Sequence, residues 1–126
     1  MKILVIEDHP IDLKLAGRVL EAAGFAVNGI DAAEQAFASI KADRPDLILL
    51  DMGLPGMDGL ALLKRLKADW ETREILVVAV TAYPERFSQA KAVEAGCDGY
   101  LLKPISTRKL PEQLSDVAGR AKRDEQ

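Results

Sequence analysis

The sequence predicts a single α/β domain built around a parallel β-sheet. Short apolar runs alternate with amphipathic stretches along the whole chain, five of each. The run at 47–50, Leu-Ile-Leu-Leu, lacks the polar alternation of a half-exposed strand and is typical of a strand covered on both faces. Parallel neighbours need a crossover connection, and the amphipathic stretches supply the helices for it.

Length and composition limit the chain to one domain. Its 126 residues, 48% of them hydrophobic, are enough to bury a single core. The formal net charge of −3, with charges of both signs, argues against direct contact with nucleic acid or an anionic membrane. The single cysteine, Cys97, excludes an internal disulfide, and no apolar run approaches the ~20 residues of a membrane span. We therefore expect a soluble, cytoplasmic protein.

The five strands are each expected to precede a helix. Asp31 and Asp58 are candidate helix caps, Pro10 and Pro84 suit the first helical turn, and Gly24 is a stop signal. The expected strands are 3–6, 47–51, 75–81 and 99–103, together with a shorter strand that begins at 25–27. The expected helices are 10–23, 32–40, 59–66, 84–95 and 107–121. Residues 1–121 would then form the domain, and 122–126 a charged C-terminal tail.

Polar side chains follow four of the five expected strands. Glu7 and Asp8 follow the first strand, Asp51 ends the third, and Thr81 and Lys103 end the fourth and fifth. The carboxyl ends of parallel strands lie along one edge of a sheet, where open α/β sheets bind their ligands. These five residues are therefore expected to meet there, although they are far apart in the chain.

This set of side chains predicts phosphoryl chemistry with a divalent cation. Neighbouring carboxylates repel one another unless a cation joins them, and hard oxygen ligands suit Mg²⁺ rather than zinc. Mg²⁺ commonly partners a phosphate, and the Lys103 ammonium and Thr81 hydroxyl suit two further phosphoryl oxygens. An aspartate can itself be the nucleophile that forms an aspartyl phosphate, and Asp51 is the best-placed acceptor.

Each residue also has a structural interpretation. Asp8 alone is consistent with a cap of the first helix, and Asp51 with a strand-end carboxylate paired with Lys103 in a structural salt bridge. Thr81 alone is typical of an ordinary β-branched strand residue. His9 is interpreted as a surface or loop histidine. The combination of acidic, hydroxyl and lysine residues at one edge favours the functional interpretation.

The same residues carry a resemblance to a known family. From Lys2 to about Ala121 the chain resembles the response-regulator receiver domains of two-component signalling. The matching features are the acidic pair, the apolar strand that ends on Asp51 with its Leu-Pro-Gly-Met-Asp-Gly loop, Val80-Thr81-Ala82 and Lys103-Pro104. The later Glu-Ala-Gly-Cys-Asp-Gly-Tyr stretch is nearest to single-domain regulators of the cell-division type.

The resemblance implies both a fold and a ligand set. The fold would be a flavodoxin-like (βα)5 domain with sheet order 2-1-3-4-5 and a cis bond before Pro104. Asp51 would be the phosphoacceptor and would bind Mg²⁺ directly together with Asp8. Glu7 would act mainly through a bound water, and the carbonyl of Gly53 would be a further ligand.

The resemblance also implies how the signal is received and passed on. Thr81 and Lys103 would hold the phosphoryl oxygens, while Thr81 and Tyr100 would form a two-state switch. By strand periodicity Tyr100 points away from Lys103, toward the fourth and fifth helices. The phosphodonor would be a sensor histidine kinase or a histidine phosphotransfer protein. A downstream protein would bind the fourth helix, fifth strand and fifth helix, so the chain is expected to be a switch rather than an enzyme.

Two alternatives have sequence features that count against them. A Mg²⁺-dependent phosphatase with an aspartyl nucleophile is expected to carry a second aspartate two residues beyond the first, where this chain has Gly53. A receiver-like adaptor that works without phosphorylation is disfavoured because the residues for phosphorylation are all present. Gly53 and Tyr83 would flank the phosphoryl group and influence its lifetime.

Overall fold

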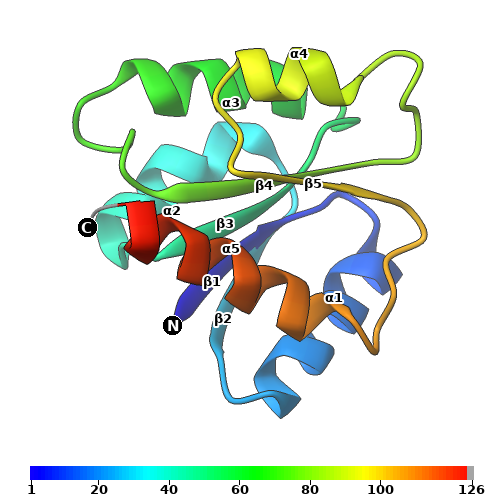
Figure 1. The fold of residues 1–126 in the computed structure, drawn as a ribbon. Helices are drawn as coiled ribbons and strands as arrows, with labels where there is room; N and C mark the ends of the chain where they lie inside the picture. Colours follow the sequence, from blue (N-terminus) through cyan, green and yellow to red (C-terminus); the bar gives the residue numbers. More distant parts are fainter. Residues whose placement is uncertain (125–126) are drawn as a thin grey trace.

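The computed structural model describes residues 1–124 and confirms the predicted α/β architecture (Figure 1). Within these residues one parallel sheet has the predicted order β2-β1-β3-β4-β5. Its strands are Lys2–Ile6 (β1), Ala26–Ile30 (β2), Leu47–Asp51 (β3), Leu76–Thr81 (β4) and Gly99–Leu102 (β5). The helices are Pro10–Ala22 (α1), the 3₁₀ turn Ala33–Gln35 (η1), Ala36–Ala42 (α2), Gly59–Ala68 (α3), Gln89–Glu94 (α4) and Leu110–Asp124 (α5).

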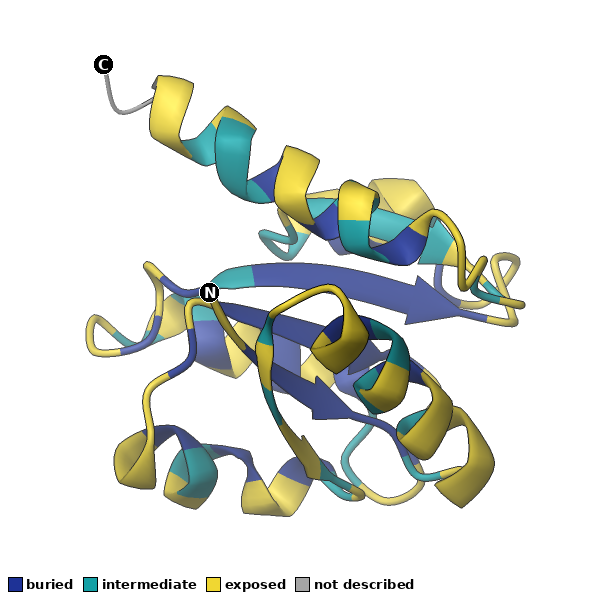
Figure 2. Cartoon of the chain, turned by 90° about the horizontal axis from the view of Figure 1, so that it is seen from below, coloured by how far each residue is buried: buried dark blue, intermediate teal, exposed yellow. Residues whose placement is uncertain are grey.

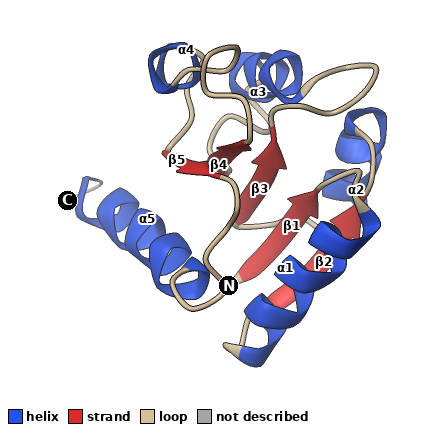
Figure 3. Ribbon diagram, turned by 90° about the vertical axis from the view of Figure 1, so that its right-hand side faces the viewer, coloured by secondary structure: helices blue, strands red, loops and turns tan. Residues whose placement is uncertain are grey.

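The helices cover both faces of the sheet (Figure 3). α1 and α5 pack on one face, and α2, α3 and α4 pack on the other. In β3, Leu47 and Leu49 join the core beside α1 and α5, whereas Ile48 and Leu50 join the opposite core. Every residue of β3 is therefore buried, as its apolar run indicates, and the helices are exposed on their outer sides (Figure 2).

Several helix limits lie at the predicted residues. Pro10 begins α1, and the carboxylate of Asp58 caps α3 by accepting a hydrogen bond from the Ala61 N–H at 2.8 Å. Gly24 and Gly96 follow α1 and α4 with φ angles of 97° and 105°. Glycine adopts this left-handed conformation without the steric cost of a Cβ, so both residues end their helices.

The start of α4 differs from the prediction. The helix begins at Gln89 rather than at Pro84. Residues 83–87 form a single turn that buries Phe87, and Ser88 then adopts an extended backbone with ψ of 157°. The Ser88 hydroxyl accepts a hydrogen bond from the backbone three residues later and caps α4. Burial of Phe87 therefore outweighs the helix-start signal of proline.

β2 begins near the predicted residues, at Ala26, and runs to Ile30, so that it pairs with the whole length of β1. The predicted cap of the helix that follows was wrong. Asp31 does not cap the following helix; its carboxylate accepts a hydrogen bond from the side chain of Gln35 at 3.1 Å. A local side-chain contact thus replaced the expected cap, and pairing with β1 sets the length of β2.

The last helix begins and ends later than predicted. α5 starts at Leu110 rather than near Thr107, and residues 107–109 before it form a turn in which the Ser106 hydroxyl accepts a hydrogen bond from the Lys109 N–H. It continues through Lys122, which the sequence placed in a charged tail. Residues 125–126 of that tail lie outside the described residues. Within residues 1–124, no helix combines the length and apolarity needed to cross a membrane.

We predict that Gly59→Ala destabilises the protein. A Cβ at Gly59 would lie 2.1 Å from the carbonyl oxygen of Asp51 and 2.7 Å from Cα of Met52, and these backbone atoms belong to the end of β3. We expect the free energy of unfolding in urea to fall by about 3 kcal/mol. Gly17→Ala in α1 is the matched control, because its Cβ would meet nothing nearer than 3.9 Å. That control should gain about 0.5–1 kcal/mol, and equal stability of the two variants would contradict the prediction.

Candidate functional site

The structure places the five predicted site residues at the carboxyl edge of the sheet. β1 leads into Glu7 and Asp8, β3 ends at Asp51, β4 ends at Thr81, and β5 leads into Lys103. Pairing continues to the edge, since the N–H of Lys103 donates to the Thr81 carbonyl at 2.9 Å. The bond between Lys103 and the following proline is cis.

The Lys103 ammonium lies between two buried carboxylates. Its Nζ donates to Glu7 Oε1 at 2.6 Å and to Asp51 Oδ2 at 3.2 Å, and Asp12 Oδ2 lies 3.7 Å away. The side chain of Lys103 is 15% exposed, and those of Glu7 and Asp51 are 7% exposed. These ion pairs are therefore much less screened than pairs on a surface. The salt bridge considered from the sequence is present, within a larger cluster of charges.

Burial and neighbouring charges shift the pKa values of this pair. Burial raises the pKa of Glu7, and the adjacent Asp51 carboxylate adds to the increase, although the hydrogen bond from Lys103 opposes it. Burial alone would lower the pKa of Lys103, but its hydrogen bond to Glu7 and the charge of Asp51 outweigh this effect and raise it. Lys103 therefore stays a cation at neutral pH and offsets the charge of the two carboxylates.

The side of Asp51 that faces the loops is bounded by Gly53 and Tyr83. Asp51 itself is 6% exposed, and its Oδ1 accepts a hydrogen bond from the Gly53 N–H at 3.0 Å. A Cβ on Gly53 would lie 3.7 Å from that oxygen and 3.8 Å from the ring of Tyr83, which is largely exposed. The absence of a side chain at position 53 leaves this approach to the carboxylate open.

Asp8 contributes a carboxylate oxygen that lacks a hydrogen-bond partner. The N-cap of α1 is His9, and no side chain caps this helix, so capping does not account for Asp8. Asp8 Oδ1 is buried and makes no hydrogen bond to any of the described residues. Burial of a carboxylate oxygen without a hydrogen bond is costly, so this atom is suited to a cation.

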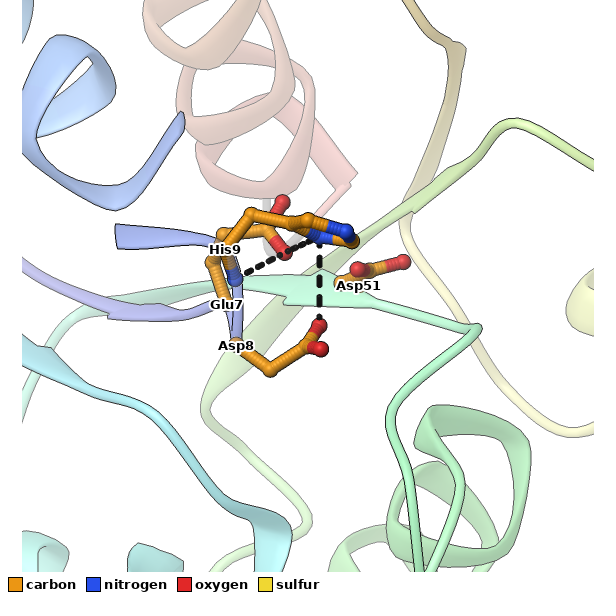
Figure 4. A group of neighbouring side chains, drawn as sticks. All are labelled: Glu7, Asp8, His9 and Asp51. Carbon is orange, nitrogen blue, oxygen red and sulfur yellow. Dashed lines mark hydrogen bonds and ion pairs between the residues drawn. The ribbon is translucent and has the colours of Figure 1, made fainter. Parts of the chain in front are cut away.

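His9 faces the acidic cluster, although the sequence interpretation left it out. Its Nδ1 lies 3.4 Å from Glu7 Oε2 and 3.5 Å from Asp8 Oδ1 (Figure 4). The hydrogen bond to Glu7, with the charges of Asp8 and Glu7, raises the pKa of the imidazole. Its position directly after the acidic pair was the available signal, but the direction of the ring depends on how the loop leaves β1.

This group of side chains can hold a metal ion. Glu7, Asp8, His9 and Asp51 each offer a ligand atom, and these atoms lie within 4.8 Å of one another. Three of the four ligands are carboxylates, and one of them has the unpaired oxygen described above. Hard carboxylate oxygens around one point suit a divalent cation, so the residues present fit the ion that the resemblance implies.

The predicted switch residues lie on either side of the loop between β4 and α4. Thr81 is fully buried, and its Oγ1 accepts a hydrogen bond from the Tyr83 N–H at 2.9 Å. Tyr100 is half-buried against the core beside α2, α3 and α4, and its hydroxyl donates to the Phe87 carbonyl at 2.5 Å. The two residues are thus tied to opposite ends of the same loop.

Comparison with known families identifies the class of this domain. Residues 3–115 match the response regulator receiver domain family. The match covers most of the chain, and it agrees with the sheet order and with the carboxylates at the strand ends. The chain belongs to the response regulator receiver domains of two-component signalling. Receiver domains interact with histidine kinases and downstream targets.

The chain is similar to curated polar-differentiation response regulators of bacteria. The chain is 36% identical to the polar-differentiation response regulator DivK of Brucella anthropi, over 94% of this chain and 97% of that protein. DivK of Brucella ovis is 34% identical with the same coverage. The resemblance to single-domain regulators of the cell-division type is therefore confirmed.

Solved structures agree on the fold. A CheY-like receiver domain protein from Methanospirillum hungatei superimposes with a TM-score of 0.88 and 26% identity, over 98% of this chain and 97% of that one. A putative response regulator from Chloroflexus aurantiacus gives 0.85 and 28% identity, over 92% and 95%. The predicted flavodoxin-like (βα)5 class is confirmed.

We predict that Lys103→Ala keeps the fold but lowers its stability in a pH-dependent way. Without the ammonium, Glu7 and Asp51 face each other uncompensated, and the loss should reach about 3 kcal/mol at pH 7.5 in the absence of divalent ions. The pKa of Glu7 should rise further in the variant, so its protonation restores stability as pH falls, and the gap to the parent should narrow toward pH 5.

The measurement is urea unfolding at both pH values. Lys64→Ala removes an exposed lysine of α3 and serves as the matched control. A Lys103→Ala variant as stable as this control at pH 7.5 would show that the buried ion pairs contribute little.

Proposed function

We propose that this receiver domain takes a phosphoryl group onto Asp51 in the presence of Mg²⁺, and that the donor is a phosphohistidine of a sensor kinase or phosphotransfer protein. One observation carries the proposal. Asp51 is a buried carboxylate that contacts Lys103, and it lies at the same edge of the sheet as the carboxylates of Glu7 and Asp8. The domain that would accept the phosphoryl group comprises residues 1–121. We propose that it works in the cytoplasm.

Each side chain has a role in this transfer. Glu7, Asp8, Asp51 and the carbonyl of Gly53 would hold the ion, with Glu7 acting mainly through water. When bound, Mg²⁺ supplies positive charge that offsets the carboxylates and the phosphoryl oxygens. An Asp51 oxygen attacks phosphorus and forms an O–P bond. The P–N bond of the donor breaks, and the donor imidazole keeps the electron pair and takes up a proton.

Lys103 and Thr81 would stabilise the transferred group. The Lys103 ammonium already contacts Asp51, and its contact with Glu7 can be exchanged for one with a phosphoryl oxygen. A charge-assisted hydrogen bond of this kind stabilises charge that develops on the equatorial oxygens. Thr81 would release the Tyr83 N–H and donate its hydroxyl to a second phosphoryl oxygen.

The surface beside Lys103 supports docking of the donor. A cavity of about 340 Å³ lies between α1 and the segment that follows β5, and its lining includes Leu15, Lys103 and Ile105. Ile11 and Leu15 on α1 are exposed, so an apolar surface adjoins the site. A helical, histidine-bearing partner could bury these side chains while it presents its phosphohistidine to Asp51.

The signal would reach partner proteins through the two hydrogen bonds that hold the β4–α4 loop. Movement of Thr81 toward the phosphoryl group would release the start of the loop at Tyr83, and the far end of the same loop accepts the Tyr100 hydroxyl. Tyr100 would then turn inward and alter the surface formed by α4, β5 and α5, where Val93 and Leu102 are exposed. A tenfold change in partner affinity needs only about 1.4 kcal/mol of coupling.

We predict that acetyl phosphate labels the protein at Asp51 only with Mg²⁺ present. The cation is needed because carboxylate and phosphate charges meet at close range. Intact mass spectrometry should show one phosphoryl adduct with Mg²⁺, and none in excess chelator or in Asp51→Asn. An adduct that survives in Asp51→Asn would place the acceptor elsewhere.

We predict that the phosphoryl mimic beryllofluoride, added with Mg²⁺, moves the Tyr100 ring and the amides of the loop before α4. The chain has two tyrosines, so Tyr100→Phe assigns the ring signals by difference. Solution NMR should show shifts that extend from Asp51 through residues 82–88 to β5. Shifts confined to the loops around Asp51 would mean that the output surface is wrongly assigned.

A further inference from the structure

The imidazole of His9 is the feature of the site that the proposed function does not use. His9 is the single histidine of the chain, and it lies between β1 and α1 directly after the acidic pair. Its side chain is 66% exposed, and the Nδ1 edge of the ring faces both Glu7 and Asp8 (Figure 4). His9 therefore adds a nitrogen ligand to a cluster whose other ligand atoms are carboxylate oxygens.

The spacing of these atoms suits a metal ion bound between them. Nδ1 is 3.4 Å from Glu7 Oε2 and 3.5 Å from Asp8 Oδ1. With metal–ligand bonds of about 2.1 Å, neighbouring ligands lie about 3.4 Å apart in a tetrahedral site and about 3.0 Å apart in an octahedral one. The two distances from Nδ1 are close to the tetrahedral spacing. Asp8 Oδ1 is also the buried oxygen that lacks a hydrogen bond among the described residues.

The chemistry of the ligands separates two kinds of ion. Mg²⁺ takes oxygen ligands in octahedral geometry, so it gains nothing from His9. Imidazole suits zinc and its first-row neighbours, and a site of one imidazole with carboxylates is a common zinc ligand set. An ion of this kind would replace the contact between Nδ1 and Glu7.

We propose that His9 is a metal ligand, and that it makes this acidic cluster a mixed imidazole–carboxylate site that binds Zn²⁺ more tightly than Mg²⁺. The ligands would be His9 Nδ1 and the carboxylates of Glu7 and Asp8, with Asp51 within reach. The proposal rests on the proposed function only in that both ions use the same carboxylates. Zn²⁺ and Mg²⁺ therefore exclude each other, and Zn²⁺ competes with the ion that supports phosphorylation.

The test is a Zn²⁺ titration of protein that carries no affinity tag. With ¹⁵N-labelled histidine, the single imidazole gives one pair of ring nitrogen signals, and Nδ1 should move while Nε2 moves much less. Calorimetry should show that His9→Gln weakens Zn²⁺ binding at least about tenfold, because one of three ligands is lost. Excess Mg²⁺ should raise the apparent Kd for Zn²⁺ in the parent protein.

Cys97 is the other side chain with affinity for zinc, so Cys97→Ser is the control. It lies outside the cluster and should leave the Kd for Zn²⁺ and the shift of Nδ1 unchanged. Equal Zn²⁺ affinity in the parent and His9→Gln, or an unmoved imidazole at saturation, would overturn the proposal. Labelling of Asp51 with Mg²⁺ in the parent reports separately on the proposed function, so either conclusion can fail without the other.

Discussion

The contact of the Lys103 ammonium with Glu7 and Asp51 is the interaction on which the site depends. The sheet order places β1 and β3 side by side, so the carboxylates at their ends are forced together. β5 is separated from β3 by β4, and the long lysine side chain spans that gap. Without a cation the two buried carboxylates would repel each other and the pKa of one would rise strongly. The ammonium therefore allows an acidic site to exist at this edge before any metal binds.

The loop between β4 and α4 connects this site to the rest of the molecule. One end of the loop is held by the hydrogen bond between Thr81 and the Tyr83 N–H, and the other by the bond from Tyr100 to the Phe87 carbonyl. The intervening residues are exposed and form turns instead of a continuous helix. Segments with few buried contacts open at low free-energy cost, so this loop is suited to carry a change from the site to the α4, β5 and α5 surface.

His9 gives the site a property that the family match alone does not describe. The acidic pair and Asp51 account for a site of hard oxygen ligands, whereas the imidazole adds a ligand that prefers softer ions. The distance from Nδ1 to the unpaired oxygen of Asp8 connects the two observations. The choice of ion, as well as phosphorylation, would then depend on the loop that follows β1.

The sequence by itself determined the fold class and the position of the principal site residues. Continuous apolar runs such as Leu47–Leu50 can only be satisfied by burial on both faces, and that requirement places Asp51 at the end of a central strand. The capping signal at Asp58 was right, whereas the equally local signal at Asp31 was wrong because that carboxylate binds the side chain of Gln35 instead. The sheet order came from the resemblance to a family, because periodicity does not say which strands are neighbours.

Only the tertiary structure decided features that depend on distant contacts. Burial of Phe87 moved the start of α4 past Pro84, and pairing with β1 set where β2 ends. The direction of the His9 ring and the unpaired oxygen of Asp8 depend on how one loop leaves the sheet beside Glu7. The helix and strand preferences that local sequence sets are about 1 kcal/mol or less per residue. Burial of one large side chain contributes about 2 kcal/mol. Packing therefore prevails wherever the two disagree.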